Sequence, residues 1–132
     1  MRILFIDNDK TWLEYLEKVL NKEGYKVEIE TDFEEAFEHT KNSTFDFIFY
    51  DSKAFCENKS FVYRLFEEGL NNRVIVTSSL PNYNEAMEAI RYGAIDYVEK
   101  FSDYADFIKI IEKNKNSNPI NKLNLKRRLE KQ

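Results

Sequence analysis

Five short apolar runs alternate along this chain with five segments whose apolar residues recur every three or four positions. The runs are candidate strands, and they cover residues 3–6, 25–29, 45–50, 74–77 and 95–98. Runs that are apolar nearly throughout are typical of parallel strands buried on both faces. Because helices alternate with these strands, the pattern predicts an α/β fold in three layers: a five-stranded parallel sheet with five helices on its faces.

The helical segments carry start and stop residues of the usual kinds. Gly24 and Gly93 suit the ends of the first and fourth helices, since glycine readily ends a helix. Asp32 is a good N-cap for the second helix, and the last helix is predicted to start at Ser102. The third helix is predicted between residues 60 and 69.

Several other side chains are predicted to have structural rather than chemical roles. Trp12, Met87 and the phenylalanines are expected in the core. His39 is expected to be a solvated residue on the second helix, without a partner. Cys56 is the only cysteine, which excludes an internal disulfide and a cysteine-based zinc site, and we expect it to be a spectator.

Length and charge bound the remaining choices. The 132 residues suffice for one compact domain, and no apolar run approaches the roughly 20 residues of a membrane helix. No signal-peptide pattern opens the chain, so a cytoplasmic protein is expected. The net charge of −4 is uneven: residues 1–111 carry 13 Lys and Arg against 22 Asp and Glu, whereas residues 112–132 carry 7 against 2. The acidic part is therefore not expected to bind nucleic acid. No membrane partner is expected either.

The composition changes after Lys115, where Pro119 and several asparagines break the last helical pattern. We place a domain boundary there, with residues 1–115 as the folded domain and residues 116–132 as a basic C-terminal tail or linker. Three interpretations of the tail stay open: a solvated end, a short helix that binds a partner, and the start of a linker to an output domain.

Chemically active side chains follow four of the five predicted strands. Asp7, Asn8 and Asp9 follow the first strand, Asp51 the third, Thr77 and Ser78 the fourth, and Lys100 the fifth. In open α/β sheets, ligands bind outside the carboxyl ends of the strands. Two carboxylates brought together there need a cation between them, and Mg²⁺ and Lys100 are the natural candidates. The set predicts a phosphoryl-transfer site that works by positioning and charge neutralisation.

Four motifs, "ILFIDND", "FDFIFYDS", "VIVTSS" and "GAIDYVEK", together resemble the receiver domain of two-component response regulators. The resemblance covers about residues 2–113. It implies a flavodoxin-like fold with strand order 2-1-3-4-5. It also implies a signalling phosphoacceptor rather than an enzyme in the metabolic sense, although such a domain assists its own phosphorylation and dephosphorylation.

Residue by residue, the resemblance makes Asp51 the acceptor of a phosphoryl group from the phosphohistidine of a sensor histidine kinase or phosphotransfer protein. Mg²⁺ would be held by Asp7, Asn8, Asp51 and the main-chain carbonyl of Lys53. Lys100 matches the invariant lysine of the family.

The resemblance also implies a conformational switch. Alignment backwards from "AMEAIRYGA" matches Ser78, rather than Thr77, to the switch hydroxyl. Tyr97, three residues before Lys100, matches the aromatic residue that swings inward when the hydroxyl closes on the phosphoryl group. The surface formed by the fourth helix, fifth strand and fifth helix would then meet a downstream protein partner, and a homodimer through that surface stays open.

Three positions depart from the family pattern. Asn8 replaces the second acidic residue, which removes one negative charge from the metal site. The segment after Asp51, "SKAFCENKSF", lacks the usual proline and glycine, and Phe101 stands where a proline commonly follows the lysine. These departures keep an alternative open: a degenerate receiver that binds partners without phosphorylation.

A second alternative is an enzyme. Residues 7–11 also fit DxDxT, which resembles the first motif of haloacid-dehalogenase-type phosphatases, with Asp7 as nucleophile and Asp9 as general acid. Against it, Asp103 and Asp106 lie at the start of a predicted helix rather than after a strand. That interpretation also gives Asp51 no task, and it makes Asp9 a catalytic residue where we expect a helix N-cap.

Overall fold

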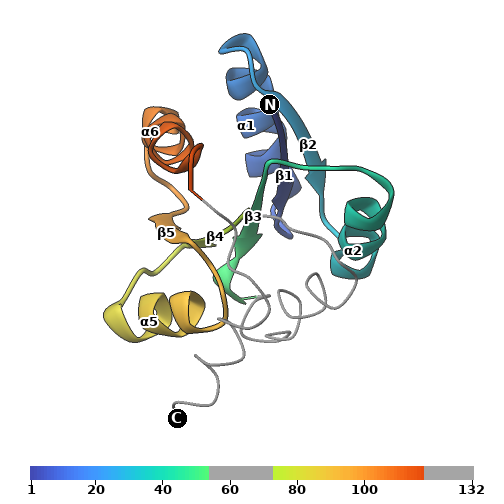
Figure 1. The fold of residues 1–132 in the computed structure, drawn as a ribbon. Coiled ribbons are helices and arrows are strands. Elements are labelled where there is room, and N and C mark those ends of the chain that lie inside the picture. Colours follow the sequence, from blue (N-terminus) through green and yellow to red (C-terminus); the bar gives the residue numbers. More distant parts are fainter. Residues whose placement is uncertain (54–72, 118–132) are drawn as a thin grey trace.

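The fold is described from a computed structural model, which places residues 1–53 and 73–117 (Figure 1). Its elements, in chain order, are β1 (Arg2–Ile6), α1 (Lys10–Lys22), β2 (Lys26–Glu30), α2 (Phe33–Asn42), β3 (Phe47–Asp51), β4 (Arg73–Ser78), α5 (Tyr83–Arg91), β5 (Asp96–Glu99) and α6 (Tyr104–Asn114). The helix predicted between residues 60 and 69, Cys56 and most of the basic tail lie outside the described residues. Within those residues, no helix is long and apolar enough to cross a membrane.

All five strands are parallel, in the order β2-β1-β3-β4-β5. This confirms the predicted flavodoxin-like α/β fold and its strand order. The order reverses at β1, which lies between β2 and β3 near the middle of the sheet (Figure 1). The carboxyl ends of β1 and β3 are therefore neighbours, at the place where open α/β sheets bind their ligands.

Two apolar clusters cover the two faces of the sheet. On one face, strand residues such as Leu4, Ile48 and Tyr50 pack against buried residues of α2 and α5. On the other face, the strand residues next to them in the sequence, such as Phe5 and Phe49, pack against α1 and α6. Successive strand residues point to opposite faces, so a strand between two helical layers is apolar at every position. All five residues of β3 are buried.

Side-chain caps fix where the helices begin. Asp9 and Asp32 accept hydrogen bonds from the backbone N–H groups of Trp12 and Glu35, which confirms both as N-caps. The last helix starts at Tyr104 rather than at the predicted Ser102, because the Asp103 side chain accepts from a backbone N–H of the first turn.

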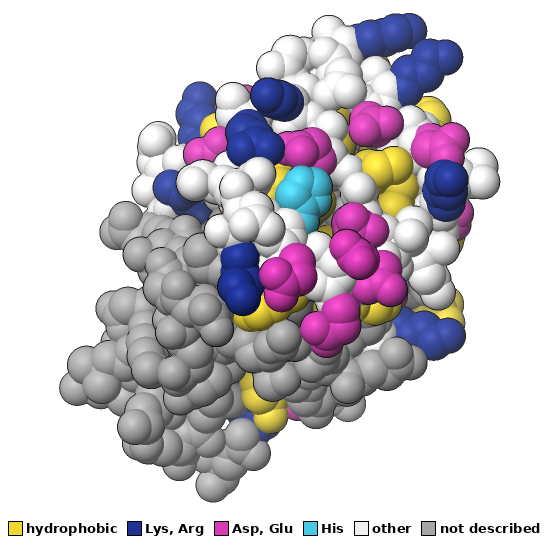
Figure 2. Space-filling view, turned by 90° about the vertical axis from the view of Figure 1, so that its right-hand side faces the viewer, with side chains coloured by type: hydrophobic (Ala, Val, Ile, Leu, Met, Phe, Trp, Pro, Cys, Tyr) yellow, Lys and Arg dark blue, Asp and Glu magenta, His cyan; other side chains and the backbone are white. Residues whose placement is uncertain are grey.

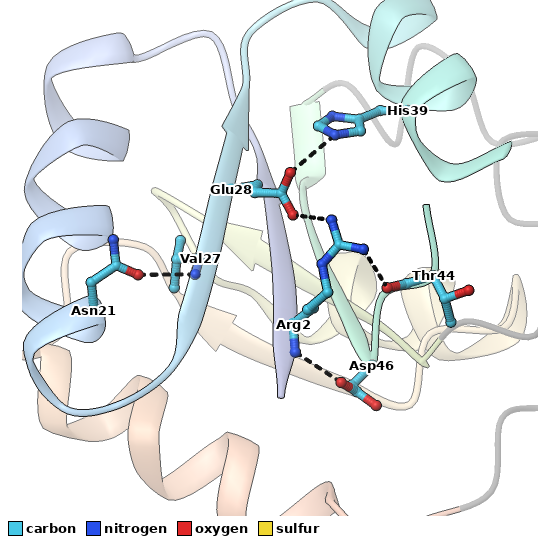
Figure 3. Close-up of polar contacts among 7 residues, drawn as sticks. All are labelled: Arg2, Asn21, Val27, Glu28, His39, Thr44 and Asp46. Atoms are coloured by element: carbon cyan, nitrogen blue, oxygen red, sulfur yellow. Dashed lines mark hydrogen bonds and ion pairs between the residues drawn. The ribbon is translucent and has the colours of Figure 1, made fainter. Parts of the chain in front are cut away.

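The amino-terminal edge of the sheet is held by an ionic network (Figure 3). Arg2 lies 2.5 Å from Glu28 on β2, and its backbone N–H donates to Asp46 at 2.8 Å. His39 Nε2 lies 3.2 Å from Glu28, and the His39 ring packs edge-on against Phe45. The prediction of a solvated, unpartnered His39 is therefore wrong: Figure 2 shows the single histidine set among acidic side chains of this face.

Some apolar side chains lie outside the core that the sequence predicted for them. Met87 and Phe101 are 50% and 62% exposed, and Trp12 is only half-buried at the edge of its cluster. Leu80 and Tyr83 are also exposed, beside the start of α5. Amphipathic spacing predicts which residues of a helix are apolar, but it does not tell which of them the sheet covers and which stay exposed at the border of the apolar face.

Candidate functional site

The carboxyl edge of the sheet brings the strand-end residues together. Ile6 pairs with Tyr50 and Asp51 with Thr77 in the parallel ladder, so Asp7 and Asp51 end adjacent strands. Neighbouring strands lie about 4.8 Å apart. The Lys100 N–H donates to the Ser78 carbonyl at 2.7 Å, which places the end of β5 beside the end of β4.

Asp7 and Lys100 form a buried ion pair. Lys100 Nζ lies 3.0 Å from Asp7 Oδ1, and the two residues are 6% and 0% exposed. Asp7 Oδ1 also accepts from the Asp9 N–H at 2.8 Å. Asp7 Oδ2 is buried and accepts no hydrogen bond from any described residue. A buried carboxylate oxygen without a donor is costly, and it suits a cation.

Asp51 ends β3 and is 8% exposed. Its Oδ2 accepts a hydrogen bond from the Lys53 N–H at 3.2 Å, which holds the chain that leaves the strand close to the carboxylate. Asn8 is exposed on the β1 side of the edge.

These residues fit a hard divalent cation in donor chemistry. Asp7, Asp51, the Asn8 amide and the Lys53 carbonyl offer only oxygen ligands, the kind that Mg²⁺ prefers. Among residues 1–53 and 73–117, no group of three or more His, Cys, Asp or Glu side chains is arranged to hold a metal ion. A cation here would therefore depend on amide and main-chain oxygens as well as on two carboxylates.

The Asp9 carboxylate contacts the start of α1 and Lys100. Its Oδ1 accepts from the Trp12 N–H at 3.1 Å as the N-cap of α1, and its Oδ2 lies 3.8 Å from Lys100 Nζ. The expectation that Asp9 is the N-cap of α1 is thus confirmed.

Two hydroxyl groups stand at the end of β4 and differ in their partners. Ser78 is buried, and its Oγ accepts from the Leu80 N–H at 3.2 Å. Thr77, opposite Asp51 in the ladder, is also buried, and its Oγ1 has no hydrogen-bond partner among the described residues.

Tyr97 is half-buried and anchored to the start of α5. Its hydroxyl donates to the Glu85 carboxylate and accepts from the Asn82 N–H at 3.4 Å. Burial raises the pKa of Tyr97 above its usual value, and the hydrogen bond to Glu85 raises this pKa further. The neighbouring Ser78 hydroxyl and the Asn82 N–H oppose part of this rise in the pKa of Tyr97.

Sequence reasoning missed two groups of neighbours. Glu85 and Asn82 hold Tyr97, and the only signal for them was that Asn82 suits a helix N-cap. The aromatic rings of Trp12 and Phe101 face Lys100, with Nζ 5.0 Å and 5.2 Å from their centroids. No spacing rule connects residues 12 and 100, so no sequence signal could have found the first contact.

Comparison with known proteins gives consistent matches. The sequence model of the response regulator receiver domain matches residues 3–112. The response regulator ArlR of Staphylococcus saprophyticus is 23% identical over 107 residues, which are 81% of this chain and 49% of ArlR. The chain thus spans about half the length of this curated relative.

Solved structures share the fold. A response regulator from Thermotoga maritima superposes with a TM-score of 0.80 at 22% identity, covering 88% of this chain and 98% of that one. An orphan response regulator of H. pylori gives 0.77 at 26% identity, covering 88% and 97%. A response regulator protein from Burkholderia pseudomallei, solved with a phosphorylated aspartic acid, a calcium ion and citrate, gives 0.71 at 21% identity, covering 86% and 68%.

Proposed function

The chain belongs to the response regulator receiver domain family, and on that premise we propose that it accepts a phosphoryl group on Asp51 from a sensor histidine kinase or phosphotransfer protein. The observation that carries the proposal is the pairing of buried Asp7 with buried Lys100, at the end of the strand beside Asp51. Such an arrangement offers a carboxylate nucleophile, a cation site and a fixed positive charge at one sheet edge.

In the proposed step, a carboxylate oxygen of Asp51 forms a bond to phosphorus while the phosphorus–nitrogen bond of the phosphohistidine breaks, and the imidazole leaves with the bonding electrons. Asp7, Asn8, Asp51 and the Lys53 carbonyl would hold Mg²⁺, which supplies charge neutralisation for the phosphoryl oxygens. Lys100, already at the site, can pair with one of those oxygens. Hydrolysis of the acyl phosphate would return Asp51 to its carboxylate form.

The proposed output is a change of contact surface. Ser78 would donate its hydroxyl to the phosphoryl group, and Tyr97 would leave its anchor on α5. The surface of α5, β5 and α6 would then meet a downstream protein, or a second copy of the chain. We place the receiver at residues 1–115 in the cytoplasm, with the remaining residues as a tail or linker.

One observation favours the degenerate receiver as a second candidate. Asn8 is neutral and exposed at the place of a family acidic residue, so the cation site has one charge fewer. A receiver whose cation site fails would still keep the fold and its contact surfaces. The phosphatase alternative lacks such support, because Asp9 caps α1 and the receiver family model spans the matching region.

Intact mass after incubation with Mg²⁺ and acetyl phosphate tests the proposal. We expect one added phosphoryl group in the wild type and none in Asp51→Asn. Label that survives in Asp51→Asn but disappears in Asp7→Asn would instead support the phosphatase chemistry. If the wild type takes no label, the degenerate receiver becomes the better description, and a partner screen follows.

A further inference from the structure

The ammonium group of Lys100 is surrounded by aromatic rings as well as by carboxylates. Lys100 Nζ lies 3.0 Å from Asp7 Oδ1 and 3.8 Å from Asp9 Oδ2. Two aromatic rings complete its surroundings: Trp12, with its centroid 5.0 Å away, and Phe101, 5.2 Å away. Both distances are within the range in which the negative face of a ring attracts a cation.

The two rings are held differently. Trp12 is fixed in α1 by edge and tilted contacts with Phe5 and Phe107, whose ring centroids lie 6.3 Å and 6.0 Å away. Phe101 is 62% exposed directly after Lys100, so packing in the core does not account for its position. Its contact with the lysine gives an exposed aromatic residue a physical role at this site.

From this geometry we propose that Trp12 and Phe101 are positioning residues that hold the Lys100 ammonium at the acceptor site. The inference rests on the proposed phosphorylation of Asp51. Lysine is a point charge on a flexible four-carbon stem, so its location depends on what surrounds it. When a cation and a phosphoryl group enter, the carboxylates change partners, whereas the ring faces keep their charge distribution and bind no metal. The rings therefore give Lys100 a constant environment while its ionic partners change.

The first test uses the unphosphorylated full chain, and it does not depend on phosphorylation. Trp12 is the only tryptophan, so its emission reports on its own surroundings. We expect Lys100→Met to change the wavelength or intensity of that emission, because the ammonium over the indole is removed. Lys18 is an exposed residue of α1, the helix that carries Trp12, so Lys18→Met is the matched control and should leave the emission unchanged. An unchanged emission in Lys100→Met would overturn the proposal.

The second test measures the rate of labelling by acetyl phosphate. Phe101→Leu should slow it about two- to fivefold, which corresponds to the ~0.5–1 kcal/mol of an exposed cation–π contact. Phe101→Tyr keeps a ring and should stay within about twofold of the wild type. Trp12→Leu should be slower than Trp12→Phe, and Phe107→Leu, which removes a ring contact of Trp12 but none of Lys100, controls for lost packing.

Equal rates for Leu and aromatic variants at both positions would overturn the positioning role. Should Trp12→Leu fail to fold, the pair of Phe101 variants decides alone. If the wild type takes no label, the proposed function fails instead, and the emission of Lys100→Met still decides whether the ring holds the ammonium.

Discussion

Lys100 Nζ donates to Asp7 Oδ1 at 3.0 Å, a buried contact between residues 93 positions apart in the sequence. It joins the end of β5 to the end of β1, across the two strands that lie between them in the sheet. Both side chains are buried, so if one were removed, water could not solvate the charge of the other. The stability of the fold is therefore tied to the same two side chains that the proposed chemistry needs.

Removal of the Lys100 ammonium should lower the stability of the fold. Lys100→Met leaves Asp7 buried without its cation, and we expect the free energy of unfolding to fall by about 3 kcal/mol, as for other buried pairs that lose one partner. Urea denaturation measures the change. Added Mg²⁺ should restore part of the loss, because a cation that binds only the folded state stabilises it.

Lys109→Met is the control for this prediction. Lys109 is exposed and lies 4.0 Å from Asp106 on the same helix, so its removal should change stability by less than about 0.5 kcal/mol. Equal effects of the two substitutions would mean that the pair of Lys100 and Asp7 contributes no more than a surface ion pair.

The two hydroxyls at the end of β4 should respond in opposite directions. Thr77 Oγ1 is buried without a hydrogen-bond partner in the described part of the chain, so the isosteric Thr77→Val should stabilise the fold by up to ~1 kcal/mol. Ser78→Ala removes the acceptor of the Leu80 N–H and should destabilise it by about 1 kcal/mol. Thermal unfolding of the two variants side by side gives the comparison, and a loss of stability in Thr77→Val would show that its hydroxyl is satisfied.

Glu85 should control the ionisation of Tyr97. Glu85→Gln removes the carboxylate that accepts from the Tyr97 hydroxyl, so we expect the pKa of Tyr97 to fall. NMR titration of ¹³C-labelled tyrosine follows this group. Glu88→Gln, on the same helix, should leave the pKa of Tyr97 unchanged, and an equal fall in both variants would contradict the assignment.

A second tyrosine should make stability depend on alkaline pH. The Tyr25 hydroxyl donates to Glu112 at 2.6 Å, and burial, followed by this hydrogen bond, raises the pKa of Tyr25 to about 12 from 10.0. The folded state thus holds the phenolic proton more tightly than the unfolded state. Its contribution to stability is complete below pH 10 and is lost as the pH rises through about 12.

Tyr25→Phe tests this sign. The variant should be less stable than the wild type at pH 8, and the difference should shrink between pH 10 and about 12, as measured by urea denaturation across that range. Tyr15→Phe, at an exposed position, is the matched control. A difference that grows with pH would mean that the folded state lowers the pKa of Tyr25 instead of raising it, and would contradict this assignment.

The sequence was sufficient for the fold class, because apolar runs that alternate with amphipathic helices leave few arrangements in which every face is covered. It also placed Asp7, Asp51, Ser78 and Lys100 at strand ends, since each of these polar residues stands at or just after the end of an apolar run. The order of the strands came from the family resemblance rather than from any spacing, as pairing between distant strands leaves no periodic mark.

The tertiary structure alone decided what those residues touch. His39 was predicted to be solvated and instead pairs with Glu28, while Met87 and Phe101 were predicted in the core and are exposed. The contact of Lys100 with Trp12 unites residues from opposite ends of the domain. Periodicity reports which face of one element is apolar. Which atoms oppose that face depends on how the helical layers close over the sheet, and this is settled only when the whole chain packs.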